Sequence, residues 1–173
     1  MAIEVVDSDI TLEGLLSIED FDTDTKGRIQ KSEILLLPFN VFGDKSERAF
    51  YPETSDFLKF AKTELDDYKI DICENKGKEK TEILQSADVW LPIFLISIDP
   101  LKDVILPIIV SLISNYLFYK SKKETKDDER SVNIQIIIHD KKRDISKNLK
   151  YDGPVSGLDK LNAIDVNKIF EGK

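Results

Sequence analysis

The sequence predicts an α+β fold, in which a mostly antiparallel sheet is covered by about three helices. Two observations support this. Short β-branched runs bounded by turn residues occur in both halves of the chain, and three other stretches place apolar residues at helical spacing. Separate strand and helix regions are typical of α+β domains. The 173 residues, 41% of them hydrophobic, are enough for one domain with its own core.

The first forty residues are expected to form strands. Residues 2–6 alternate and are β-branched, and residues 28–37 end in the run ILLL before Pro38. Proline cannot donate a ladder hydrogen bond, so it suits a strand end. The intervening DTKG has Asp first and Gly fourth, which is typical of a type I turn with a bulge. We therefore expect an N-terminal hairpin that pairs residues 15–22 with residues 28–37.

The stretch DTDTKGRIQKSE, residues 22–33, also resembles the calcium-binding loop of an EF-hand. Five of its positions match that loop: Asp22, Asp24, Gly27, Ile29 and Glu33. Lys26, however, stands where the loop needs an oxygen ligand, and its ammonium group would repel the cation. The hairpin is therefore the favoured interpretation. A metal site at Asp22, Asp24 and Glu33 is the alternative.

Three helices are expected to cover the sheet. Residues 55–67 carry aromatic and apolar side chains at helical spacing. Residues 100–120 follow an Asp-Pro helix-start signal and present a wide apolar face. Residues 156–171 carry a sparser apolar stripe, with a second start signal at Asp165.

The remaining strands are expected near residue 70 and over residues 132–151. The second region alternates clearly, and the turn DKKRD divides it into two strands. Before it, residues 120–130 (KSKKETKDDER) contain no apolar side chain, so we expect a mobile connector. The whole chain is then a single domain, in which this connector separates residues 1–119 from a small C-terminal ββα unit, residues 131–173.

Residues 89–119 are the most apolar part of the chain, and they allow more than one interpretation. Lys102 and Asp103 divide them into runs of ten and sixteen residues. A sixteen-residue helix is about 24 Å long, less than the roughly 30 Å of a hydrocarbon core. A buried core helix is therefore favoured. A membrane-associated hairpin, followed by a lysine-rich cytoplasmic flank, is the alternative, and a partner-binding apolar helix is the third.

Charge and motif content argue against several function classes. The net charge is −8, and residues 1–75 hold 18 acidic against 8 basic side chains, which disfavours nucleic-acid binding. Cys73 stands alone and is expected to be a small buried residue, so neither a disulfide nor a cysteine-based zinc site fits. No glycine-rich phosphate motif occurs. His139 is interpreted as a polar residue at a strand end, because Asp140 would point to the opposite face.

The expected function is that of a non-enzymatic accessory or protein-interaction domain of a bacterial cytoplasm. Its partner would be another protein or a second copy, with no cofactor and no nucleic acid. The cytoplasmic expectation follows because the start MAIEVVDSD lacks a signal-peptide pattern. One alternative is a membrane-associated protein at the inner face of the plasma membrane, anchored by residues 89–119. Another is a calcium-binding domain that uses residues 22–33, and an enzyme is the fourth.

Overall fold

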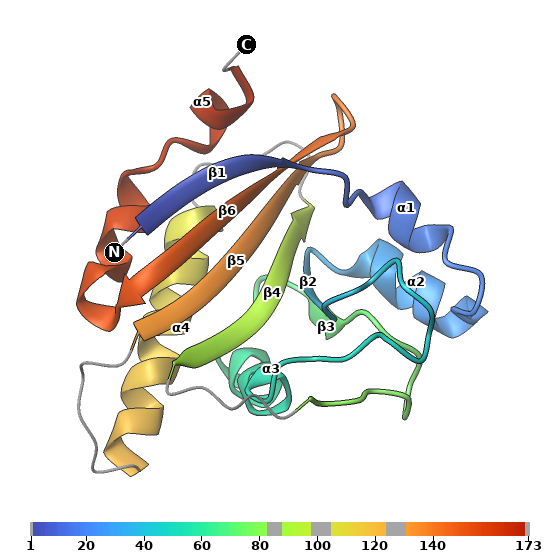
Figure 1. The fold of residues 1–173 in the computed structure, drawn as a ribbon, viewed down its shortest axis with the longest axis horizontal. Coiled ribbons are helices and arrows are strands. Elements are labelled where there is room, and N and C mark those ends of the chain that lie inside the picture. Colours follow the sequence, from blue (N-terminus) through green and yellow to red (C-terminus); the bar gives the residue numbers. More distant parts are fainter. Residues whose placement is uncertain (1, 83–87, 98–104, 124–130, 172–173) are drawn as a thin grey trace.

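The computed structural model describes residues 2–82, 88–97, 105–123 and 131–171, and its centre is a six-stranded sheet (Figure 1). The sheet order is β1-β6-β5-β4-β2-β3. The strands are β1 (Ala2–Ser8), β2 (Ile34–Leu37), β3 (Ile70–Ile72), β4 (Val89–Ser97), β5 (Ser131–Asp140) and β6 (Ile145–Pro154). The helices are α1 (Leu12–Leu16), α2 (Thr23–Lys31), α3 (Thr54–Glu64), α4 (Ile105–Lys123), the 3-10 helix η1 (Val155–Ala163) and α5 (Val166–Glu171).

The prediction of a mostly antiparallel sheet under three helices is wrong, because the sheet is mixed and about six helices accompany it. β4 runs parallel to β5, and β2 runs parallel to β3, while the other neighbours are antiparallel. The main cause of the error is β4, because its residues belong to the apolar stretch of residues 89–119, for which a buried core helix is the favoured interpretation. That interpretation is wrong for Val89–Ser97, which form a strand. Parallel neighbours need a crossover connection, and α4 lies in the connection between β4 and β5.

β4 lies in the middle of the sheet, and its residues from Leu91 to Ser97 are all buried. Such a strand reads as a continuous apolar run, because both of its faces are covered. Pro92 lies where the β4–β5 register shifts between Trp90 and Ile93. A proline is tolerated inside a sheet at such an irregularity, since no ladder hydrogen bond is then required of it.

The predicted N-terminal hairpin is also wrong, because residues 23–31 form the helix α2. The Asp22 side chain caps it by accepting a hydrogen bond from the backbone N–H of Thr25 at 2.8 Å. Thr25 and Ile29, four residues apart, point into the core and are fully buried. α1 ends at Leu16, so it overlaps only the start of the predicted first hairpin strand, residues 15–22. β2 pairs with β3 and β4 instead.

The other helices and the C-terminal strands agree better with the sequence. α3 matches the predicted helix of residues 55–67, and β5 and β6 form the predicted hairpin. The C-terminal helical region forms as two pieces, η1 and α5. α4 continues to Lys123, beyond the predicted start of the connector. The Asp99-Pro100 start signal and residues 124–130 lie outside the described residues.

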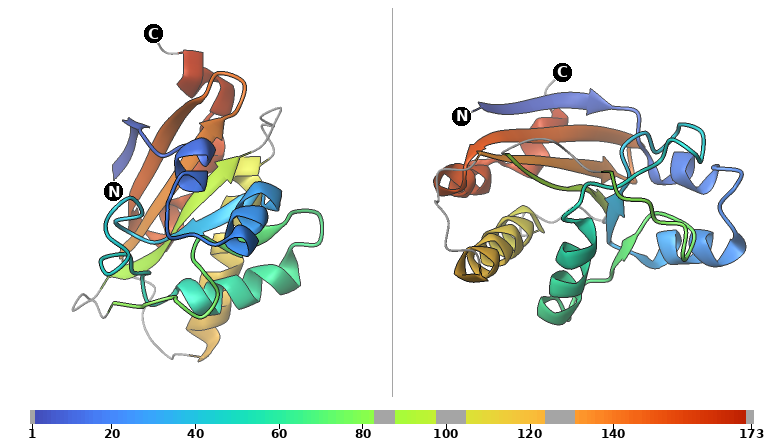
Figure 2. Two further views of the ribbon diagram at one scale, coloured as in Figure 1. Left: turned by 90° about the vertical axis from the view of Figure 1, so that its right-hand side faces the viewer. Right: turned by 60° about the horizontal axis from the view of Figure 1, so that its bottom comes forward.

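Helices lie on both faces of the sheet (Figure 2), and a buried core lies on each face. α3, α4, η1 and α5 cover the first face, where the buried side of α4 includes Ile109, Ile113 and Tyr116. α1, α2 and the loop of residues 38–50 cover the second face near β2 and β4. The described part of the predicted core helix of residues 100–120 lies in α4, and its inner side packs against the sheet as expected. Across the described residues, no helix has both the length and the hydropathy that crossing a bilayer requires.

Candidate functional site

The second face of the sheet is covered at one end only (Figures 1 and 2). α1, α2 and residues 38–50 pack near β2 and β4, whereas no helix of the described residues lies over the same face of β1, β6 and the first half of β5. We call this uncovered part the open face. Its described residues are Glu4, Tyr51, Trp90, Ile93, Asn133, Gln135, Asn148, Lys150 and Asp152.

The strand register explains why these side chains meet. Residues directly opposite one another on neighbouring strands point to the same face. One row across the sheet therefore contains Trp90, Asn133 and Asp152. The next row contains Ile93, Gln135, Lys150 and Glu4.

Aromatic rings form one wall of the open face. The ring centroids of Tyr51 and Trp90 are 5.2 Å apart, and Tyr51 lies 5.1 Å from Phe39 on its other side. Each of these side chains is partly exposed. Aromatic contacts of this kind favour particular ring geometries and so help to order the wall.

Side-chain amides form the floor beside this wall. Asn148 Nδ2 donates a hydrogen bond to Gln135 Oε1 at 3.2 Å. Among the described residues, neither Asn133 Nδ2 nor Asn148 Oδ1 has a hydrogen-bond partner, although both atoms are buried. Folded proteins leave few buried polar atoms unpaired, because each one costs free energy. The unpaired amide atoms can therefore bond to water or to a ligand, and of the two residues Asn133 borders the hollow.

A hollow of about 300 Å³ lies between the aromatic wall and the amides. Glu4, Lys150 and Asp152 place two carboxylates and one ammonium group at its border. Lys150 is directly opposite Glu4 in the β1–β6 ladder, so these two charges offset each other. The exposed carboxylate of Asp152 then gives the hollow a net negative charge.

His139 lies at the other end of the same face, in a polar row with Ser97 and Ser146, which are buried, and Ser8, which is partly exposed. Its Nδ1 is 2.9 Å from Ser146 Oγ, and its Nε2 is 3.6 Å from Asp144 Oδ1. The residue types are those of a hydrolase triad, but His139 and Ser146 are only 3% and 4% exposed. A nucleophile must reach its substrate, so this arrangement is structural. Burial lowers the pKa of His139, which favours the neutral ring.

A buried ion cluster joins three segments of the N-terminal half. Arg48 Nε donates to Glu74 Oε2 at 2.9 Å, and Arg48 Nη1 donates to Asp20 Oδ1 at 2.9 Å. The guanidinium group also lies 4.8 Å from the centroid of the Phe21 ring. The hydrogen bond from Arg48 is the largest influence on Asp20 and lowers its pKa. Because these groups already satisfy one another, the cluster holds the fold together rather than forming a binding site.

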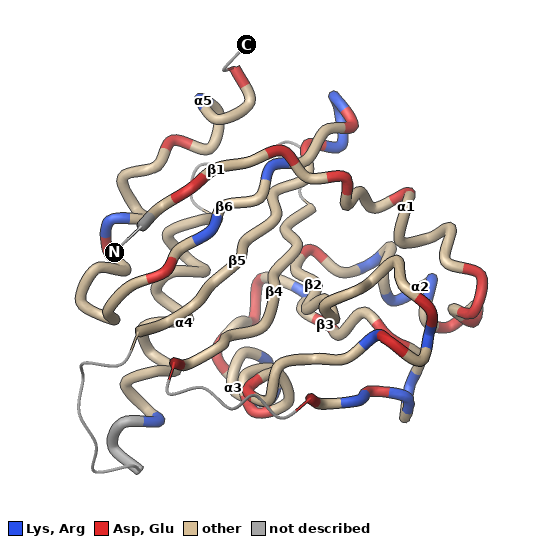
Figure 3. The backbone as a smooth tube through the Cα atoms, viewed as in Figure 1, with Lys and Arg blue, Asp and Glu red and all other residues tan. Residues whose placement is uncertain are grey.

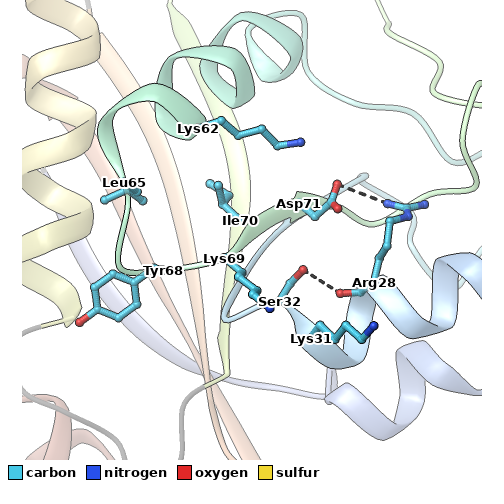
Figure 4. A pocket seen from close by; sticks show the side chains of 9 residues that line it. All are labelled: Arg28, Lys31, Ser32, Lys62, Leu65, Tyr68, Lys69, Ile70 and Asp71. Atoms are coloured by element: carbon cyan, nitrogen blue, oxygen red, sulfur yellow. Dashed lines mark hydrogen bonds and ion pairs between the residues drawn. The ribbon is translucent and has the colours of Figure 1, made fainter.

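A second hollow, of about 340 Å³, is bordered by Arg28, Lys31, Lys62 and Lys69 around Asp71 (Figure 4). Four cations beside one carboxylate suggest an anion site. However, Arg28 and Lys31 lie in the last turn of α2, and Lys62 lies in the last turn of α3. Basic side chains there offset the negative end of the helix dipole. The same dipoles would oppose a bound anion, so helix stabilisation accounts for these residues.

The three acidic residues of the EF-hand-like motif each have a partner within the protein. Asp22 caps α2, Asp24 pairs with Arg28 at 3.3 Å, and Glu33 Oε1 accepts a hydrogen bond from the Lys69 N–H at 3.3 Å. A helix therefore stands where a calcium-binding loop would have to bend. In the part of the chain that the structure describes, no group of three His, Cys, Asp or Glu residues could hold a metal ion.

Sequence reasoning found only part of the open face. The alternation of β5 placed Asn133 and Gln135 on the polar side of a strand, and this is where they lie. Trp90 was interpreted as a residue of an apolar segment, and the contact between Tyr51 and Trp90 joins positions that no local pattern connects. Cys73 is buried as predicted, and burial raises the pKa of its thiol to about 12.

Comparison of the chain with protein-family models, with curated proteins and with solved structures finds no match. The functional interpretation therefore rests on the geometry and charge of the open face. These two properties are enough to define a testable binding partner.

Proposed function

We propose that this protein is a non-enzymatic interaction domain whose open face binds a basic segment of a partner protein. The observation that carries the proposal is the contact of Tyr51 with Trp90 beside the side-chain amides, around a hollow of about 300 Å³. Tyrosine and tryptophan are enriched among the residues that dominate protein–protein binding energy. Amides at the floor would fix the orientation of the bound segment through hydrogen bonds.

Charge favours a basic partner. Acidic positions run along β1 and around α1 (Figure 3), and the whole chain carries a net charge of −8. An arginine or lysine of the partner could lie against the Trp90 ring while pairing with Asp152. The field of the whole chain would also speed the encounter with a positively charged segment.

The position of the reactive side chains supports binding over catalysis. His139 and Cys73 are buried at 3% and 0% exposure, and neither borders the hollow. The groups that do border it are amides, aromatic rings and charged side chains, which recognise a ligand without needing to react with it.

Trp90 makes the proposal directly testable, because it is the only tryptophan. Its emission would be followed during titration with a short peptide rich in Arg and Lys, an acidic peptide of equal length and a neutral oligosaccharide. We expect a saturating change with the basic peptide only, weakened by added salt. Asp152→Asn should weaken binding about tenfold, which corresponds to about 1.4 kcal/mol.

Asp67→Asn is the matched control, since it also removes one exposed carboxylate. Asp67 lies between α3 and β3, at the opposite edge of the sheet from β1, so its loss should leave the affinity unchanged. An absent response to the basic peptide, or equal losses in the two variants, would overturn the proposal. If only the oligosaccharide gave a saturating response, the open face would bind a sugar and not a partner protein.

A further inference from the structure

The two edges of the sheet differ in how their backbone groups are occupied. β3 contributes only three residues, and side chains occupy the backbone groups of Ile72. Arg28 Nη1 donates to the carbonyl of Ile72 at 3.2 Å, and the Ile72 N–H donates to Asp71 Oδ1 at 2.7 Å. Such coverage prevents another strand from adding to this edge.

β1, at the other edge, lacks this protection. Its seven residues pair with β6 in unbroken register from Ala2↔Asp152 to Ser8↔Ser146, without a proline or a bulge. No described strand pairs with its outer side. Ile3 and Val5 are 38% and 40% exposed, on the same sheet face as the core residues Tyr151 and Leu149. A long, regular and partly apolar edge is a template for a further strand.

We propose that β1 pairs antiparallel with β1 of a second copy of this chain, about a two-fold axis at Val5. This register uses all seven residues and places Val5 opposite Val5 of the other copy. Ile3 then faces Asp7, and Glu4 faces Val6. A two-fold interface of this kind closes on itself, as most homodimer interfaces do.

The strand's own sequence suits self-pairing in this register, because no two carboxylates stand directly opposite each other. Glu4 faces an apolar residue, and Asp7 is already paired with Lys147 of its own chain. An axis at Glu4 would instead set two carboxylates directly opposite each other, which destabilises a strand pair. A two-fold axis at Val5, perpendicular to the sheet, leaves both open faces on one side of a continuous twelve-stranded sheet.

The dimer is expected to be weak, because two seven-residue strands form a smaller contact than a standard interface. Sedimentation equilibrium should give a Kd on the order of 10–100 µM. Salt should strengthen the dimer, since it screens the repulsion between two chains of charge −8.

Val5→Lys should raise the Kd at least about tenfold, or about 1.4 kcal/mol. The matched control, Ile145→Lys, changes an apolar residue that is also 40% exposed, and it should leave the Kd unchanged.

A monomer at concentrations on the order of 1 mM would overturn the proposal. Equal effects of the two lysine variants would overturn it as well, because Ile145 lies on β6 and outside the proposed contact. Circular dichroism on both variants checks that their secondary structure is retained, so that loss of the dimer is not caused by unfolding.

Cysteine cross-linking tests the register independently of these variants. Val5→Cys should form a disulfide-linked dimer on air oxidation, because opposite residues lie within disulfide reach. A mixture of Ile3→Cys and Asp7→Cys chains should form the mixed dimer, whereas Ile3→Cys alone should not link. The native Cys73 is fully buried and does not interfere. The proposed pairing would be overturned if Glu4→Cys formed the linked dimer faster than Val5→Cys. It would also be overturned if Val5→Cys linked no faster than the exposed control Ser55→Cys.

Discussion

Arg48 is the residue at which three distant segments of the chain meet. Its guanidinium group joins the loop before α3 to Asp20, which lies between α1 and α2, and to Glu74, which follows β3. The side chains of Arg48 and Glu74 are 2% and 4% exposed. A buried ion pair adds little net stability compared with apolar residues of the same size, but breaking it leaves one charge buried and unpaired.

We expect Arg48→Met to lower the free energy of unfolding by about 3–5 kcal/mol, because the Glu74 carboxylate would then be buried without a partner. The double variant Arg48→Met with Glu74→Leu should recover much of this loss. Asp20 does not prevent the recovery, since its side chain is 33% exposed and water can hydrate it. Urea denaturation at neutral pH measures all three proteins. Equal losses in the single and double variants would show that the unpaired charge is not the cause.

His139 should make the stability depend on pH. Burial lowers its pKa in the folded protein, and the attraction of Asp144 opposes this only in part. As the pH falls, the unfolded chain therefore binds the proton first, starting near the ordinary pKa of about 6.5. The free energy of unfolding should fall from about pH 7 to about pH 5. His139→Gln can still bond Ser146 but cannot titrate, so its stability should fall less over this range. Urea denaturation measures the free energy of unfolding of both proteins at each pH. If both lose the same amount between about pH 7 and about pH 5, the expectation is contradicted.

At the scale of elements, α2 explains why a turn pattern misled the sequence prediction. The residues of a type I turn have backbone angles close to those of a helix, so DTKG suits a helical turn equally well. What selects the helix is the burial of Thr25 and Ile29 on one side, together with the Asp22 cap. Burial depends on the rest of the molecule and cannot be read from the sequence of residues 22–33 alone.

Gly27→Ala distinguishes the helix from both loop interpretations. Gly27 lies inside α2, and a Cβ added there would meet nothing within 4 Å. Alanine should therefore raise the free energy of unfolding by about 0.5–1 kcal/mol. Gly77→Ala is the contrasting control, since Gly77 has a φ of +77° and should lose stability on the same change. Thermal or urea denaturation measures both, and a loss of stability in Gly27→Ala would favour a loop.

β4 and α4 show that local sequence pattern is equally limited in predicting the structure of apolar runs. Periodicity cannot separate a strand buried on both faces from a buried helix, because in either case nearly every residue is apolar. A proline within an apolar run also argues against a central strand. The register shift beside it removes that objection, but only the pairing with β5 reveals the shift.

At the scale of the whole molecule, the net charge of −8 acts on the two proposed contacts in opposite directions. It attracts a basic segment to the open face and opposes the approach of a second copy along β1. Salt should therefore weaken the first contact and strengthen the second. The two contacts also use different parts of the sheet, its face and its edge, so a dimer could present two open faces to one partner and gain affinity through bivalency.

The sequence by itself determined the α+β class, α3, the β5–β6 hairpin, the burial of Cys73 and the inward packing of α4. These features follow from local periodicity and composition, which survive in any compact arrangement of the chain. Only the tertiary structure decided the mixed strand order, the identity of β4 and α2, and the meeting of Tyr51 with Trp90 beside the amides of β5 and β6. Those features depend on which segments become neighbours, and that is set by burial and register between residues far apart in the chain.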